Sequence, residues 1–183
     1  MGRFQSFDPK AELSGGTALA FLININHENI ENILRAHHLE NIDTERWYSL
    51  QSVLNVMSDI SEGFDYGSNF VAIGLAAGEL GIKMLPPSMA NFTVEEFFID
   101  YEKTYLARHR NGDVGWVKTE KLDDSHFIIR TRTPYPDDVV YGVFYAYVRR
   151  FTPPGKRFVL RYDENAPRHD EGGEETILHI TLS

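Results

Sequence analysis

The stretch that decides the fold of this 183-residue chain is TPYPDDVVYGVFYAYVRRFTPPG, residues 133–155. Pro134 and Pro136 end the preceding segment, and Asp137 or Asp138 then provides a helix N-cap. Apolar side chains follow at helical spacing, namely Val140, Phe144, Tyr147, Val148 and Phe151. Because residues 152–155 read Thr-Pro-Pro-Gly, the helix ends there. The stretch therefore predicts one amphipathic helix with a sharp beginning and end.

The segments on both sides of this helix alternate between apolar and polar residues. Residues 116–122 and 126–133 flank the pair Asp123-Asp124, which predicts a β-hairpin. Residues 158–162 and 176–182 alternate in the same way, and a polar loop joins them. The order strand, strand, helix, strand, strand predicts an antiparallel sheet with one helix packed on it. We therefore expect an α+β fold whose C-terminal part is a β-β-α-β-β block.

The rest of the chain has the pattern of helices. We expect a single domain with a loose N-terminal arm over residues 1–16, a mainly helical part over 17–111 and the β-β-α-β-β block over 112–183. Residues 17–25 favour a helix or irregular structure, with the helix preferred.

Caps mark where the predicted helices begin. Asn26 is an expected N-cap, and Asp43 is expected to cap a second helix whose apolar face starts at Trp47. Thr93 and Glu96 form a capping box for a fourth helix, which Asn111-Gly112 follows. The basic residues 108–110 in its last turn complement the carbonyl end of that helix.

The third and fourth helices differ in side-chain size, and this difference points to a candidate cavity. The third, over residues 66–80, contains small residues that leave room for another backbone or for a ligand. The fourth has a broad aromatic face. The candidate ligand-binding residues are Phe70, Gly74, Phe97, Tyr101, Tyr105, Phe144 and Tyr147. The alternative, in which these side chains simply pack together as core, stays open.

Composition and charge exclude several classes of function. Residues 1–106 hold 6 Lys/Arg against 15 Asp/Glu, whereas residues 107–183 hold 12 of each, which gives the net charge of −9. An acidic half argues against general nucleic-acid binding and against docking on an anionic membrane. No membrane span or secretory signal is evident, so we expect a cytoplasmic protein. The absence of cysteine excludes thiolate metal sites and cysteine nucleophiles.

The seven histidines do not form a recognisable metal site. His37 and His38 are adjacent, so on a helix they point about 100° apart and cannot bind one ion together. His169 precedes several carboxylates in a loop that we expect to be solvated, whereas His109 and His179 are expected at the surface. No nucleophile elbow, phosphate loop or metalloprotease motif occurs, and we predict no metal and no reaction.

Three stretches give the chain a resemblance to a known group of domains: RRFTPPGKRFVLRYD (149–163), HDEGGEETILHI (169–180) and LENIDTERWYSLQSVLNVMSDISE (39–62). With the element order, they resemble the 4-vinyl-reductase-type domains and their structural relatives. These relatives are the haem-nitric-oxide-binding sensor domains, including bacterial ones, and the transport-particle (TRAPP) subunits. The resemblance implies a shared scaffold for ligand binding or assembly, but fold alone does not fix function.

The functional residues of these families are mostly absent. The sensor domains bind haem through a histidine in the long helix before the sheet and through a Tyr-x-Ser-x-Arg motif. The matching helix has residues 100–103 where that histidine is expected, and Arg130 and Arg132 match the motif only in part. We therefore predict no cofactor and do not expect haem, although a haem-based gas sensor remains the third alternative.

Two functions remain. The preferred one is a non-catalytic regulatory domain that senses a small apolar or aromatic molecule. The alternative is a protein–protein interaction scaffold, a homodimer or heteromer without a ligand, with Trp47 and Tyr48 as anchors.

Overall fold

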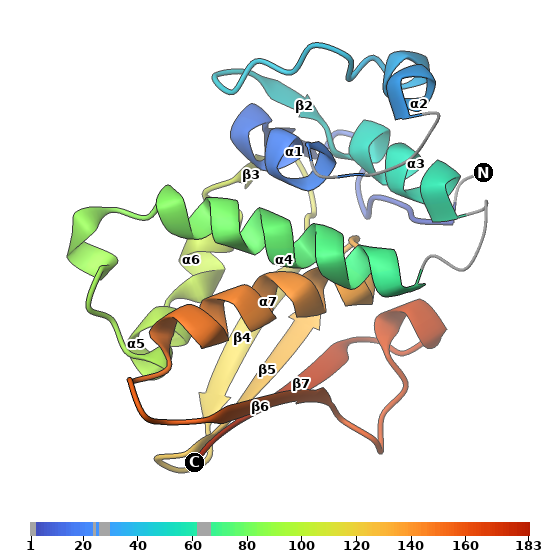
Figure 1. Ribbon diagram of the computed structural model, residues 1–183. Helices are drawn as coiled ribbons and strands as arrows, with labels where there is room; N and C mark the ends of the chain where they lie inside the picture. Colours follow the sequence, from blue (N-terminus) through green and yellow to red (C-terminus); the bar gives the residue numbers. More distant parts are fainter. Residues whose placement is uncertain (1–2, 24, 26–29, 62–66) are drawn as a thin grey trace.

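The computed structural model describes residues 3–23, 25, 30–61 and 67–183 (Figure 1). The helices are α1 (Gly15–Leu22), α2 (Ile30–Ala36), α3 (Leu50–Ser61), α4 (Gly67–Lys83), α5 (Val94–Ile99), α6 (Tyr101–Leu106) and α7 (Asp137–Phe151), with 3-10 turns η1 (Pro87–Met89) and η2 (His169–Glu171). The strands are β1 (Glu12–Ser14), β2 (Trp47–Ser49), β3 (His109–Arg110), β4 (Trp116–Lys121), β5 (His126–Arg132), β6 (Phe158–Tyr162) and β7 (Thr176–Leu182).

The C-terminal block confirms the predicted α+β fold. Strands β4 to β7 form an antiparallel sheet in the order β4-β5-β7-β6, and α7 lies across it (Figure 1). Ile129 pairs with Leu178 and Phe127 with Ile180, and all four side chains are buried under the helices. The alternation that predicted the strands therefore also selects the face of the sheet that α7 covers.

Helices α4 and α7 pack with their backbones in contact, and glycines make this possible. A Cβ atom added at Gly74 would overlap the carbonyl oxygen of Val139, and one added at Gly142 would overlap that of Val71. Side chains are thus excluded at both crossing points. The small residues of α4 are explained by close helix packing.

The fourth predicted helix begins as expected and is then interrupted. Thr93 and Glu96 form the capping box, with the Thr93 N–H donating to Glu96 Oε2 at 2.7 Å. The chain leaves helical geometry at Asp100, where φ is −107° and ψ is 6°, so α5 and α6 are separate helices. Helices α5 and α6 both contact β4.

Two predictions for the N-terminal half were wrong. Residues 12–14 are not part of a loose arm, because they form β1, which pairs with both β2 and β3 in a second, small sheet. Phe4 and Leu13 are buried, so the arm is held by apolar contacts. Trp47 lies in β2 rather than in a helix, and α3 begins only at Leu50. The expected N-cap Asn26 lies outside the described residues.

The start of α7 also differs from the prediction. Pro136 is the N-cap, and neither aspartate caps the helix with its side chain. Asp137 instead accepts hydrogen bonds from the Thr176 hydroxyl at 2.5 Å and from the Asp170 N–H at 2.8 Å. The carboxylate thereby ties the start of α7 to η2 and β7.

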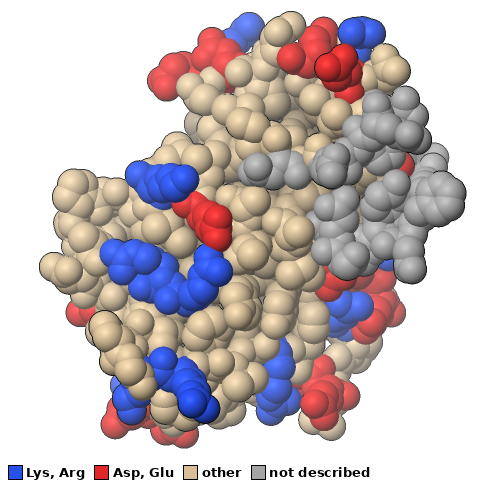
Figure 2. All heavy atoms as spheres, in the orientation of Figure 1, with Lys and Arg blue, Asp and Glu red and all other residues tan. Residues whose placement is uncertain are grey.

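Charge is distributed unevenly on the surface. Figure 2 shows Lys and Arg side chains gathered near helices α4 and α7, whereas both signs mix at the end of the molecule formed by the N-terminal half. Arg149 of α7 pairs with Glu79 of α4 at the surface, where both side chains are about half exposed. Among the described residues, no helix is both long and apolar enough to cross a membrane.

Candidate functional site

A cavity of about 60 Å³ lies between the N-terminal half and the sheet. Helix α1 borders it on one side and α7 on another, with α6, Val117 of β4 and the residues after β5 completing the wall. The lining residues are Thr17, Ala20, Phe21, Ala77, Tyr101, Tyr105, Arg108, His109, Val117, Thr133, Tyr135, Val139, Val140, Val143, Phe144 and Tyr147. The cavity is therefore mainly apolar and aromatic, with a few polar groups.

Two hydroxyls in the cavity wall have no hydrogen-bond partner among the described residues. Tyr101 is 8% exposed and Thr133 is 5% exposed, and both line the cavity. By contrast, the neighbouring Tyr105 hydroxyl donates to the carbonyl of Val114 at 2.5 Å. Neither hydroxyl is among the fully buried side-chain oxygens without a partner, which in the described part of the chain are those of Thr119 and Thr131, so both remain open to the cavity. A hydroxyl that opens onto a cavity is normally satisfied by water or a ligand.

Arg108 brings a positive charge to the cavity. Its guanidinium lies beside the Tyr147 hydroxyl and partly offsets the effect of burial, which raises the pKa of Tyr147. Gly81 of α4 makes room for this pair, because a Cβ there would overlap the Tyr147 oxygen and lie 3.6 Å from Arg108 Nη1. Burial raises the pKa of Tyr101, and the nearby charge of Arg108 works against that increase. The cation and the phenols thus belong to one cluster.

His109 is buried and is not the surface residue that its sequence position predicted. Its Nδ1 lies 2.7 Å from the Tyr105 carbonyl oxygen, and its Nε2 lies 2.7 Å from the Tyr135 hydroxyl. The carbonyl can only accept, so Nδ1 carries the proton and Nε2 accepts from Tyr135. Burial lowers the pKa of His109 to about 4, and the charge of Arg108 adds to this effect. His109 is therefore neutral near pH 7.

The predicted ligand-binding residues divide into two groups. Tyr101, Tyr105, Phe144 and Tyr147 line the cavity. The other three lie elsewhere: Phe70 packs edge-on against Phe4, Gly74 sits in the α4–α7 crossing, and Phe97 stacks on Phe151. Whether the first group binds a ligand remains a prediction.

The polar members of the site were not predicted from the sequence. Arg108 and His109 were assigned to the exposed last turn of a helix, but α6 ends at Leu106 and the chain passes into β3. Strand alternation then sends His109 inward and Arg110 outward, where Arg110 pairs with Glu12 at 2.6 Å. The sequence carries no local signal for this strand, because β3 forms by pairing with β1, which is distant in the chain.

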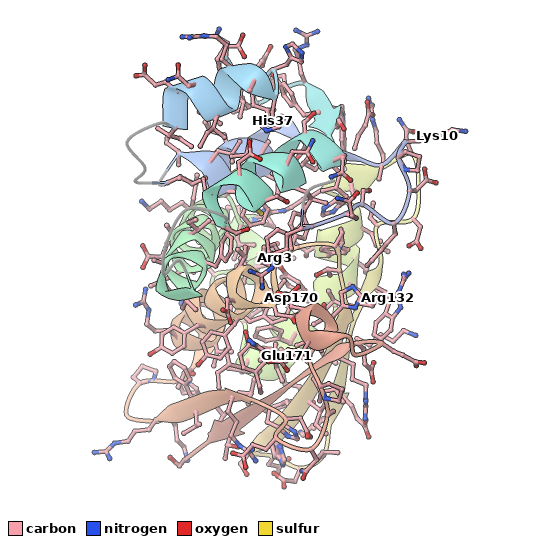
Figure 3. The ribbon with its side chains drawn as sticks, turned by 90° about the vertical axis from the view of Figure 1, so that its right-hand side faces the viewer. Arg3, Lys10, His37, Arg132, Asp170 and Glu171 are labelled. Atoms are coloured by element: carbon pink, nitrogen blue, oxygen red, sulfur yellow. The ribbon has the colours of Figure 1, made fainter. Side chains whose placement is uncertain are left out.

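A second polar cluster lies at η2, outside the cavity. The Asp137 N–H donates to Asp170 Oδ2 at 2.7 Å, which reciprocates the bond from the Asp170 N–H. Desolvation, followed by repulsion from Asp137, raises the pKa of Asp170 to about 6. Arg3 of the N-terminal segment lies near Asp170 and opposes this increase (Figure 3). The cluster joins three segments of the chain and needs no ligand to do so.

His179 is also more enclosed than predicted. It lies on β7, a central strand of the sheet, and its Nε2 is 2.8 Å from Asp163 Oδ2. Its Nδ1 is 2.9 Å from His126 Nε2, so the three side chains form a chain of hydrogen bonds on the outer face. His37 likewise binds Asp59 rather than an ion. Within the described residues, no three His, Asp or Glu side chains are placed to hold a metal.

The expected interaction anchors are engaged within the chain. Arg110 lies over the Trp47 ring at 4.5 Å, and the Tyr48 hydroxyl accepts from the Asp43 N–H at 2.7 Å. Both aromatic residues are half-buried.

The cavity does not fit haem. Its volume of about 60 Å³ is far below the roughly 300–1,000 Å³ of pockets that hold large ligands. His109 is the one histidine in the wall, and both of its ring nitrogens already have hydrogen-bond partners, so neither nitrogen is free to bind iron. The α5–α6 junction offers Asp100 and Tyr101 in place of a histidine.

Comparison with solved structures shows that the chain has the fold of H-NOX domains, the haem-nitric-oxide-binding group. An oxygen-binding H-NOX domain related to soluble guanylate cyclases, in its oxygen complex, matches with a TM-score of 0.70 and 12% identity over 92% of both chains. An H-NOX protein from S. oneidensis in the Fe(II)NO state matches with a TM-score of 0.71 and 9% identity, over 93% of this chain and 99% of that one. A Cs H-NOX variant with 4-cyano-L-phenylalanine matches with a TM-score of 0.69 and 11% identity, over 92% and 94%.

Sequence comparison adds nothing to this result. No protein-family model matches the chain, and no curated protein matches it. At 9–12% identity, the structural likeness establishes the fold and not the activity.

Proposed function

We propose that this chain is a non-catalytic sensory domain of the H-NOX fold that binds a small molecule, and not haem, in the cavity beside Tyr101. The observation that supports this most strongly is Tyr101, a buried residue that borders the cavity and whose hydroxyl has no hydrogen-bond partner among the described residues. A phenylalanine would fill the same space without the cost of an unsatisfied hydroxyl. The hydroxyl is therefore explained by a partner that enters the cavity.

The volume limits what the ligand is. One water needs about 10–15 Å³ of such space, so about 60 Å³ accommodates roughly four to six waters or a molecule with a similar number of non-hydrogen atoms. An engineered cavity of about 150 Å³ is known to bind benzene. The expected aromatic ligand would thus require the wall to move, and a smaller molecule fits better.

The position of the cavity provides a route from binding to output. Its wall combines α1 and Arg108, which belong to the N-terminal half, with α7 and Val117, which belong to the block around the main sheet. A ligand that contacts both parts favours the relative arrangement in which its contacts are best. We place this action in the bacterial cytoplasm, with a partner protein or a second copy of the chain reading the change.

An NMR screen of molecules with three to six non-hydrogen atoms tests the proposal. We expect saturable shifts at Tyr101, Val140 and other cavity residues, together with a rise in thermal stability. Tyr101→Phe should weaken both effects. Tyr145→Phe is the matched control, because Tyr145 lies on the same helix as Val140 but packs on Phe158 outside the cavity.

Two results would refute this function. One is a screen in which no molecule shifts the cavity residues, while Tyr101→Phe raises the stability of the chain as expected for plain core packing. The other is a Soret band in the purified protein, which would show that haem binds after all.

An interaction scaffold is the second candidate. Ile99 is the last residue of α5 and Leu106 the last of α6, and these apolar side chains are 58% and 44% exposed, so each could anchor a partner. A homodimer that uses these side chains should dissociate in the double variant Ile99→Ser, Leu106→Ser, as measured by light scattering. A monomeric wild-type chain at micromolar concentration would exclude the dimer.

A further inference from the structure

We infer that the cavity selects a small monoanion, a short-chain carboxylate or a similarly sized oxyanion, whose charged end binds Arg108 and Tyr101. This inference rests on the proposed function, because it names the class of ligand for the same cavity.

The balance of charge around the cavity favours an anion. Its wall contains the guanidinium of Arg108 and no Asp or Glu among the described residues. His109 adds no charge, since its ring is neutral and both nitrogens are bonded. An anion in this space therefore meets one cation in a largely apolar surrounding, where an ion pair is stronger than in water.

Arg108 differs from the ion-paired arginines of the chain in its surroundings, because it is half-buried and borders the cavity. No described carboxylate lies within ion-pair distance of Arg108. Its neighbour Arg110 pairs with Glu12 at 2.6 Å, and five further arginines have carboxylate partners, namely Arg130, Arg132, Arg149, Arg161 and Arg168. A half-buried cation without a counter-charge is costly, and a bound anion removes that cost.

The hydroxyls provide the remaining hydrogen bonds. Tyr101 and Thr133 have hydroxyls that are free to donate, and Arg108 presents N–H groups in a planar fork that matches a carboxylate. The Tyr135 hydroxyl already donates to His109, so its remaining capacity is to accept. The donors of the wall thus include Arg108, Tyr101 and Thr133.

The apolar part of the wall determines the chemical character of the uncharged end of the ligand. Ala20, Phe21, Val140 and Phe144 offer only carbon atoms to the cavity. A methyl or ethyl group is favoured there, since each buried CH₂ contributes about 0.8 kcal/mol. Propionate, with five non-hydrogen atoms, combines such a tail with a carboxylate and stays within the size limit.

The test is an NMR titration of the full chain at constant ionic strength with sodium propionate, sodium nitrate and propionamide. Propionamide is the neutral isostere of propionate, and nitrate is the planar oxyanion without a tail. We expect saturable binding of propionate that is at least about tenfold tighter than that of propionamide, because a hydrogen bond to a charged group is worth more than a neutral one. Tighter binding of nitrate would assign the site to an inorganic oxyanion, which still supports the inference.

Variants separate the role of Arg108 from a general effect of charge. Arg108→Gln should weaken propionate binding about tenfold or more and leave propionamide binding nearly unchanged. The adjacent Arg110→Gln is the matched control, because Arg110 binds Glu12 outside the cavity, and it should bind propionate like the wild type. Tyr101→Phe serves as the second variant if Arg108→Gln does not fold. It should also weaken the binding of propionate more than that of propionamide.

The outcomes distinguish this inference from the proposed function. Equal binding of propionate and propionamide, unaffected by Arg108→Gln, would overturn anion selection and leave a neutral-ligand cavity in place. No binding of any of the three probes at tens of millimolar would also overturn the inference. The proposed function would then be decided by the wider screen described above.

Discussion

The burial of His109 makes a quantitative prediction about acid stability. The unfolded chain takes up a proton on this ring near its ordinary pKa of 6.5, whereas burial delays protonation in the folded chain until a pKa of about 4. Between these values the unfolded state binds more protons, so acid favours unfolding. Stability from this residue is therefore fully present above about pH 6.5 and falls as the pH drops towards 4.

The magnitude follows from the size of the shift. One pKa unit corresponds to about 1.36 kcal/mol, and the pKa falls by about 2.5 units. The free energy of unfolding should thus drop by about 3 kcal/mol between pH 7 and pH 4 through His109 alone. The structure supports the direction of this change in stability, because a protonated Nε2 could no longer accept the hydrogen bond from the Tyr135 hydroxyl.

Urea denaturation of the wild type and of His109→Gln at several pH values measures the effect. A glutamine side chain has both a donor and an acceptor but does not titrate, and the difference between the two proteins cancels other groups. This matters because Asp170, with its raised pKa of about 6, acts in the opposite direction over an overlapping range. A difference between the two proteins that stays constant to within about 0.5 kcal/mol from pH 7 to pH 4 would refute the buried, neutral state.

Three further predictions concern packing, charge and capping. Gly74→Ala should destabilise the chain by about 3 kcal/mol in thermal or urea unfolding, because the added Cβ would overlap a carbonyl oxygen of α7. Gly16→Ala is the control: its Cβ would lie 3.5 Å from the Met84 methyl carbon, so this variant should be neutral or slightly stabilising. Asp170→Asn should remove a component of stability that declines as the pH rises from about 4 to 6, and an unchanged pH profile would contradict the raised pKa. Thr93→Ala should cost about 1 kcal/mol through loss of the capping box, and no change in urea unfolding would show that α5 is held by packing alone.

The sequence predicted the local elements of the C-terminal block well. Prolines, apolar alternation and the stretch over residues 133–155 were enough to place β4, β5, α7, β6 and β7, because each signal acts within a few residues of the element it defines. The capping box at Thr93 was confirmed for the same reason. Errors arose where distant pairing decided the outcome, as for residues 12–14 and Trp47, which become strands only because they meet each other.

The site shows the same division. Helical spacing on the fourth predicted helix places Tyr101 and Tyr105 on one side, and both line the cavity, whereas ligand binding by them stays a prediction. It could not indicate that Phe97 packs on Phe151, or that Gly74 contacts a backbone rather than a cavity. Such assignments depend on which partner each side chain meets, and a partner far away in the sequence leaves no periodic signal.

What the sequence by itself determined is the α+β order of elements and the absence of cysteine thiolates, both of which follow from residue type and local spacing. Only the tertiary structure decided the environments of three adjacent basic residues. Arg108 faces the cavity, His109 is buried and neutral, and Arg110 pairs with Glu12 at the surface. Three adjacent basic residues look alike in a sequence. They differ here because burial and charge depend on the segments that fold around them, and the chain brings α1, β1 and Tyr135 to that point only when it is folded.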